Sequence, residues 1–293
     1  PYILDRGQSV KKDIQGATGI KEVQCLILMQ AVFLDAEHGD DSYDGTTPAK
    51  AVKTFKKAQE VGGRFSSDYY VIYVSGPVRP EDGEVLTLPE PAYMCRYTGF
   101  PVYEKDGTPA EKRSLYYGYM IEPQGSLNLS DIRIYGRRYI DDNSRNGESI
   151  LHVTEGTEVT VGEGTALARN QNLGTFIGPD GLAGSLSAKG GAAAVEAGGL
   201  LKVNGGSITE MGAANGAAIY LAVGTEGKPY GKLELDQKPR IDGDVFLAGK
   251  LEDKVHSPVI QVSEQYQPGE TEDGLDSRLY VNVEADWDGK QVV

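Results

Sequence analysis

Apolar residues recur along the chain in a fixed frame that glycine sets off. In four segments a glycine leads, two apolar residues follow at alternate positions, and a third comes after a turn. The leading glycines lie 31, 43 and 32 residues apart, and short apolar runs precede them at 120–121, 151–153, 193–195 and 219–221. The four sets are Gly125 with Leu127, Leu129 and Ile134; Gly156 with Val159, Val161 and Ala166; Gly199 with Leu201, Val203 and Ile208; and Gly231 with Leu233, Leu235 and Ile241.

This pattern predicts an all-β fold, a right-handed parallel β-helix (solenoid). Alternation turns every second residue of a strand inward, so Leu129, Val161, Val203 and Leu235 are expected to form one inward file. A single coil cannot bury its apolar face, but stacked coils make a continuous core. The alternative is a β-sandwich, which needs hairpin turns such as Asn204-Gly205 between adjacent strands.

The entry to the repeats predicts a cap for the open end of the solenoid. A strand at 32–34 and an acidic loop precede a helix at 48–60, with Thr47 at its cap and Pro48 in its first turn, and a strand at 71–74 follows. One amphipathic helix there would cover the end of the core. The expected organisation is a leader or linker at 1–30 and a β-helix domain at 31–293, made of an N-terminal cap at 31–75, entry coils with Tyr-rich insertions at 76–119, main rungs at 120–245 and C-terminal strands at 246–293.

Two parts of the chain resemble a known superfamily. The entry stretch from Val32 to Ala58, with Gly39-Asp40-Asp41-Ser42-Tyr43-Asp44-Gly45, resembles the entry segment of pectate-lyase-like right-handed β-helix proteins. Arg96-Tyr97, the segment 120–136 and the Gly-rich rungs at 193–210 and 215–243 resemble β-helix modules of large bacterial cell-surface proteins. The resemblance implies a secreted or cell-wall-attached bacterial protein that is an adhesin or acts on glycans.

Charge and composition narrow the classes of partner. The 293 residues carry a formal net charge of −14, so an acidic surface would repel nucleic acid and anionic membranes. No apolar run reaches the roughly 18 residues of a membrane helix. Cys25 and Cys95 lack metal-type spacing, and whether they pair is left open. The start at Pro1 and the apolar end at 291–293 suggest a segment of a larger multidomain chain, anchored elsewhere.

Two charged groups are candidates for chemistry. The acidic loop offers the carboxylates of Asp35, Asp40, Asp41 and Asp44, and Ca²⁺ prefers oxygen ligands, although short acidic residues also build turns. Lyases of the superfamily that this chain resembles use a basic residue as the base and Ca²⁺ to neutralise a uronate. If this chain were such a lyase, the candidates would be Arg133, Arg137 and Arg138, which equally suit a cluster of surface ion pairs.

Tyrosines concentrate between residues 69 and 119, and they predict a binding surface. Each ring pairs a large apolar body with a polar tip, which suits sugar and protein contacts, although tyrosine also favours strands. The candidates for ligand binding are Tyr97, Tyr103, Tyr116, Tyr117 and Tyr119. We therefore expect a non-catalytic, extracellular module, adhesin-like or a stalk, that binds a glycan or a host or bacterial surface protein. It would need no cofactor, and the alternative is a Ca²⁺-assisted polysaccharide lyase.

Overall fold

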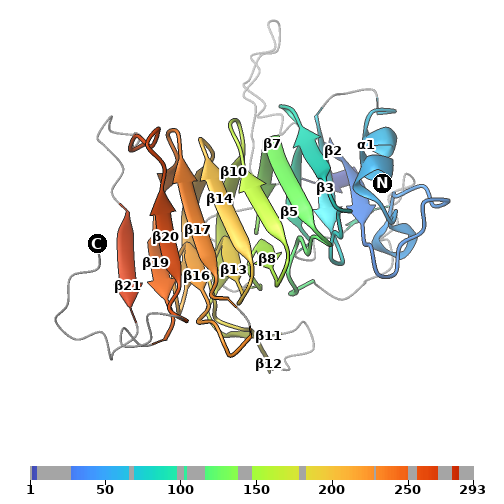
Figure 1. Cartoon of the computed structure of the whole chain (residues 1–293). Helices are drawn as coiled ribbons and strands as arrows, with labels where there is room; N and C mark the ends of the chain where they lie inside the picture. The colour runs from blue at the N-terminus through green and yellow to red at the C-terminus, as the bar shows by residue number, and fades with distance from the viewer. Residues whose placement is uncertain are drawn as a thin grey trace, which may run out of the picture.

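The chain folds into long parallel β-sheets that are stacked along one direction (Figure 1). The computed structural model describes residues 2–4, 28–65, 69–97, 102–103, 116–137, 147–177, 183–227, 229–249, 256–269 and 279–283. Within these ranges the structure is all-β except for one α-helix and one 3-10 turn. No helix in the described part of the chain has the length and apolar character that crossing a membrane requires.

Three parallel sheets, numbered here in the order in which each main coil visits them, make up the stack. The first sheet contains β4 (Glu84–Leu88), β7 (Ser126–Tyr135), β9 (Glu158–Val161), β14 (Leu200–Asn204), β17 (Lys232–Asp236) and β20 (Val259–Val262). The second contains β2 (Leu28–Leu34), β3 (Tyr70–Val74), β5 (Tyr93–Arg96), the second half of β7, β10 (Ala166–Asn172), β15 (Ser207–Ala213) and β18 (Arg240–Ile241). The third contains β8 (Leu151–Val153), β13 (Ala193–Val195), β16 (Ile219–Leu221), β19 (Asp244–Leu247) and β21 (Tyr280–Val283).

The inward file expected in the first sheet is present. Leu129 pairs in register with Val161, Val161 with Val203, and Val203 with Leu235. All four side chains are buried, at 0–2% exposure. The pairing is parallel throughout this file, so the strands are not the antiparallel hairpins that a β-sandwich needs. The arrangement is compatible with a solenoid.

The corresponding file of the second sheet differs from the prediction at one position. Leu167, not Ala166, pairs with Ile134 and Ile208 and faces the core, and Ala166 faces outward. The turn after Val161 is one residue longer than the turn after Leu129, so the next inward position moves on by one. A slip of one residue exchanges the two faces of a strand, and burial of Leu167 decides the register.

The N-terminal end is capped by a shorter helix than the sequence predicts. The helix α1 spans Phe55–Gly62, whereas Pro48–Lys50 form only a 3-10 turn. Between them Val52 is extended and bridges Leu34, because its buried side chain belongs to the core. Thr54 is the N-cap of α1 and accepts a hydrogen bond from Lys57 N.

The apolar face of α1 packs on the end of the core. Phe55, Ala58 and Val61 are buried in the same cluster as the inward residues of β2 and β3. The edge of β2 is covered by β1 (Tyr2–Leu4), which pairs antiparallel with it and with β6 (Val102–Tyr103). Part of the expected leader therefore joins the sheet. Figure 1 shows α1 at one end of the stack and β21 near the other.

A second apolar cluster lies on the outer face of the second sheet. Phe33, Tyr73 and Tyr97 pack their rings against each other there, with ring centres 5.3–6.0 Å apart. Cys95 is buried in the same cluster, and Cys25 lies outside the described residues. One insertion interrupts the coils between β10 and β13, where β11 (Thr175–Ile177) and β12 (Ala183–Ser185) form an antiparallel hairpin that projects from the stack (Figure 1).

Candidate ligand-binding site

A buried arginine organises the corner where the chain passes from the second sheet to the third. Arg96 is 1% exposed and donates hydrogen bonds to the backbone carbonyls of Gly118, Gly136 and Glu148. Burial lowers the pKa of its guanidinium to about 10, so it remains a cation at neutral pH. Its charge is held by carbonyl dipoles and by the Tyr116 ring, whose centre lies 6.0 Å from Cζ.

Asparagines continue this polar interior on the following coils. Asn170 Nδ2 donates to the carbonyls of Glu148, at 2.9 Å, and Gly191, at 2.7 Å. Asn172 is fully buried, and its Oδ1 accepts a hydrogen bond from Ala188 N. Ser149 Oγ donates to the carbonyls of Lys189 and Gly190. These bonds give the backbone carbonyls of the corner side-chain donors, and they fix the segments that carry the surface residues.

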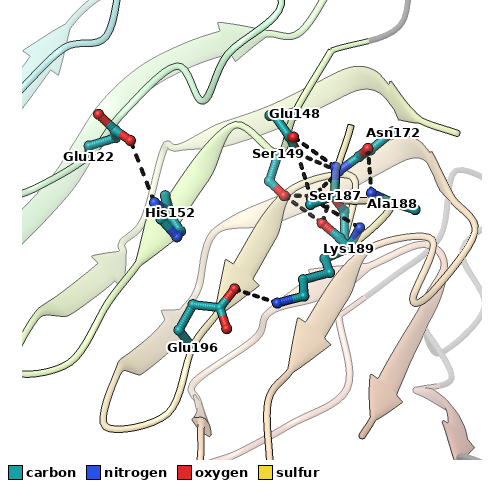
Figure 2. A network of polar contacts seen from close by, with 10 residues as sticks. Glu122, Glu148, Ser149, His152, Asn172, Ser187, Ala188, Lys189 and Glu196 are labelled. Atoms are coloured by element: carbon teal, nitrogen blue, oxygen red, sulfur yellow. Dashed lines mark hydrogen bonds and ion pairs between the residues drawn. The ribbon is translucent and has the colours of Figure 1, made fainter. Parts of the chain in front are cut away.

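The carboxylate of Glu148 ties the segment after the hairpin to this corner (Figure 2). Its Oε1 accepts a hydrogen bond from Ser187 N at 2.7 Å. Its Oε2 accepts from Asn172 Nδ2 at 3.1 Å and from Ser187 Oγ. Three donors on one carboxylate hold residues 187–189 in place, which positions Lys189 on the surface.

Two stacked ring pairs lie on the outside of the corner. Tyr117 stacks on Phe176 of the hairpin with centres 3.8 Å apart, and Tyr119 stacks on His152 with centres 4.0 Å apart. All four residues are part-exposed, and we call them the aromatic patch. The meeting faces of each pair are covered by the stacking, and the rings keep part of their remaining surface exposed.

Hydrogen bonds fix the orientation of the patch. Tyr116 Oη donates to the Tyr119 carbonyl at 2.6 Å. Burial raises the pKa of the Tyr119 phenol to about 12, so that it is neutral and can donate at physiological pH.

Ion pairs flank the patch on both sides. Glu122 Oε1 lies 3.5 Å from His152 Nδ1, and its Oε2 lies 3.4 Å from an Arg79 Nη. The hydrogen bond with His152, assisted by the charge of Arg79, lowers the pKa of the Glu122 carboxyl. Lys189 Nζ lies 2.8 Å from Glu196 Oε1 (Figure 2). The polar groups are thus fixed in place beside the rings.

The predicted ligand-binding tyrosines divide into separate groups. Tyr116, Tyr117 and Tyr119 gather at the corner, where Tyr116 supports the patch and the other two belong to it. Tyr97 is 3% exposed inside the second apolar cluster, which gives it a packing role. Tyr103 is on β6, and its side chain lies outside the described residues.

Two of the three arginines proposed for a lyase lie in the described part of the chain. Arg133 is on the outer face of the second sheet and forms an ion pair with Glu90 at 2.5 Å. Arg137 is buried, at 4% exposure. Arg138 lies outside the described residues.

The carboxylates of the acidic loop accept hydrogen bonds from the loop and from the segment that enters α1. Asp35 accepts from Glu37 N and His38 N, and Asp40 accepts from Ser42 N. Asp44 accepts from Thr46 N and Oγ1. Asp41 accepts from Lys53 N, Thr54 N and Thr54 Oγ1. In the described part of the chain, no three His, Cys, Asp or Glu side chains gather as a metal site would require. Calcium binding stays a prediction.

A groove of about 720 Å³ lies between the start of α1 and the segment 78–84, and Arg79, the ion-pair partner of Glu122, is among its lining residues. Its charged lining residues are Lys53, Lys56, Arg79, Glu81, Asp82 and Glu84. Asp82 and Glu84 already accept backbone hydrogen bonds, from Ser126 N and Glu81 N. The aromatic patch does not line this groove, and we favour the patch because its rings and polar groups are held from beneath by buried bonds.

Sequence reasoning missed the residues that support the site, including Glu148, Asn172, Ser187 and Lys189. One signal was available. Asn170 and Asn172 stand at alternate positions of one strand, so their side chains share a face. Two inward amides indicate a polar interior at that corner, since buried amides must be hydrogen-bonded.

Comparisons with known proteins identify no relative of this chain. No family model, curated protein or solved structure matches it.

Proposed function

We propose that the chain is a right-handed parallel β-helix of the pectate-lyase-like superfamily and a module of a bacterial cell-surface protein. The regular visits to three parallel sheets support the coil. The entry stretch that resembles this superfamily forms β2, the acidic loop and the α1 cap. The setting would be extracellular, with attachment to the cell wall through other regions of a larger chain.

The module would bind without catalysis, as an adhesin or stalk, and its ligand would be a glycan or a surface protein. The observation that carries this proposal is the aromatic patch, in which part-exposed rings lie beside paired charges on a corner that Arg96 stabilises from inside. Rings with polar tips supply contact area at low entropic cost, and neighbouring polar groups supply orientation. We favour a glycan over nucleic acid because the net charge is −14.

A glycan array tests the proposal. Wild-type protein should give signal on a defined set of glycans, and Tyr117→Ala and Tyr119→Ala should each abolish most of it. Tyr43→Ala is the matched control, because Tyr43 is 42% exposed in the acidic loop and outside the patch. Retained signal in both patch variants, with folding confirmed by circular dichroism, would contradict the assignment of the site.

Turnover would favour the lyase alternative instead. In a lyase, Arg133, Arg137 or Arg138 would be the base, and Ca²⁺ would neutralise the uronate carboxylate. The test is ultraviolet absorbance of unsaturated product on a panel of uronate glycans. Steady release that needs calcium and disappears in a folded Arg137→Ala variant would replace the binding proposal.

A further inference from the structure

A row of side chains on the outer face of the third sheet is continuous with the aromatic patch. Parallel register places one residue of this row on each successive coil. We call it the axial row, and its members in order are Arg79, Glu122, His152, Ala194, Tyr220, Phe246 and Asn282. Tyr119 of the patch stacks on His152, so the patch and the row share a boundary.

Aromatic surface occurs at two stations along this row. The first is the Tyr119–His152 pair. The second, two coils further on, is the Tyr220–Phe246 pair, whose ring centres are 5.9 Å apart and whose planes differ by 10°. Tyr220 and Phe246 are both part-exposed.

The stretch between the stations is polar. Ala194 is fully buried there, and Lys189 Nζ lies 4.9 Å from the centre of the Tyr220 ring. The side chains of Lys189 and Glu196 are 31% and 28% exposed, so an ammonium and a carboxylate are available to ligand hydroxyl groups between the stations.

The charges of the row are already balanced by partners. Arg79 pairs with Glu122, and Lys189 pairs with Glu196. Asp244 beside the second station accepts hydrogen bonds from Ala217 N and Asn282 Nδ2 and contributes a negative charge. An anionic ligand would be disfavoured, because the cations of the row are already paired with carboxylates and the protein is acidic. A neutral ligand avoids this repulsion and can be bound through hydrogen bonds.

We propose that the aromatic patch and the axial row form one elongated site for a linear neutral glycan whose chain runs parallel to the stacking direction. This inference rests on the proposed function and specifies its ligand class. Parallel strands lie about 4.8 Å apart, so His152 and Phe246, three coils apart, are separated by about 14 Å. Each sugar of an extended pyranose chain advances the chain by about one strand spacing, so about four units reach both stations.

Calorimetry with neutral β-1,4-linked oligosaccharides of one to six glucose, xylose or N-acetylglucosamine units tests the site. Wild-type affinity should rise with length until about four units and then level off. Tyr220→Ala should weaken binding of the hexamer by about tenfold and leave the dimer unchanged, because it removes one station only. Tyr119→Ala should weaken every length that binds. Tyr43→Ala is the control, and Tyr220→Leu repeats the test with bulk retained in case the alanine variant unfolds.

The outcomes separate the two proposals. If dimers bind as tightly as hexamers and neither Tyr220 variant has an effect, the elongated site is wrong while glycan binding at the patch stands. If affinity falls steeply with added salt, or oligouronates bind more tightly than neutral chains, the neutral class is wrong. If neither this series nor a broad array gives any binding, the proposed function fails together with this inference.

Discussion

Arg96 and Asn170 meet inside the corner, with Nη2 of the arginine 3.4 Å from Oδ1 of the asparagine. They come from β5 and β10, and the coil between them contributes Gly136 at this level. A Cβ at Gly136 would lie 2.2 Å from Asn170 Oδ1, so only glycine leaves room for the contact. The three residues form a polar interior that holds the candidate site from behind.

Loss of the buried guanidinium should destabilise the whole stack. Arg96→Met would remove the side-chain donor of the Gly118 and Gly136 carbonyls, at about 1–3 kcal/mol each, so we expect the free energy of unfolding to fall by about 3 kcal/mol or more. Urea denaturation measures this fall. Arg64→Met is the control, since Arg64 forms an exposed ion pair with Glu60. Equal midpoints for both variants would show that Arg96 is not structural.

Shortening an inward residue of the central file should be costly. Leu129 has 0% exposure and touches coils on both sides, so Leu129→Ala should lower the free energy of unfolding by about 2–5 kcal/mol. Leu173 is 50% exposed, and Leu173→Ala should change the free energy of unfolding by less than about 0.5 kcal/mol. Thermal and urea unfolding compare the two, and similar losses would argue against a continuous core.

Asp41 should act as a cap for the segment that enters α1. Its carboxylate accepts hydrogen bonds from Lys53 N at 2.8 Å and Thr54 N at 2.9 Å, so Asp41→Ala should cost about 1–2 kcal/mol. The neighbouring Asp40→Ala, which removes bonds to Ser42 within an exposed turn, should cost less.

Unfolding of wild type and Asp41→Ala with calcium and with chelator separates capping from metal binding. Capping predicts the same loss in both conditions. If calcium raises the melting temperature of wild type but not that of Asp41→Ala, the result would support the calcium site.

The contribution of Glu122 should depend on pH. Its pKa is lowered in the folded state, chiefly by the hydrogen bond with His152. The stability it provides is therefore full above the unfolded pKa of about 4.3 and is lost as pH falls through the lower folded value. The difference in unfolding free energy between wild type and Glu122→Gln should shrink as pH falls below about 5. Urea unfolding at several pH values measures it, and a difference that grows in acid would contradict the assigned ion pairs.

Part of the candidate site was within reach of sequence reasoning. The cluster of tyrosines pointed to the segment where Tyr116, Tyr117 and Tyr119 gather, because aromatic residues crowded near one turn remain neighbours in space. The pattern did not separate Tyr97, which packs against Phe33 and Tyr73, since strand tyrosines look alike in sequence whether they face solvent or a second cluster.

The sequence by itself determined the strand frame, because alternation with a leading glycine leaves one way to bury Leu129, Val161, Val203 and Leu235 together. Only the tertiary structure decided where turns of unequal length place the next strand, as at Leu167. It also decided where the helix begins, because burial of Val52 outweighs the Thr47-Pro48 start signal. It also brought His152 against Tyr119 and Glu148 against Ser187. Those contacts join residues from different coils, and the distance between coils in sequence carries no information about which side chains meet across them.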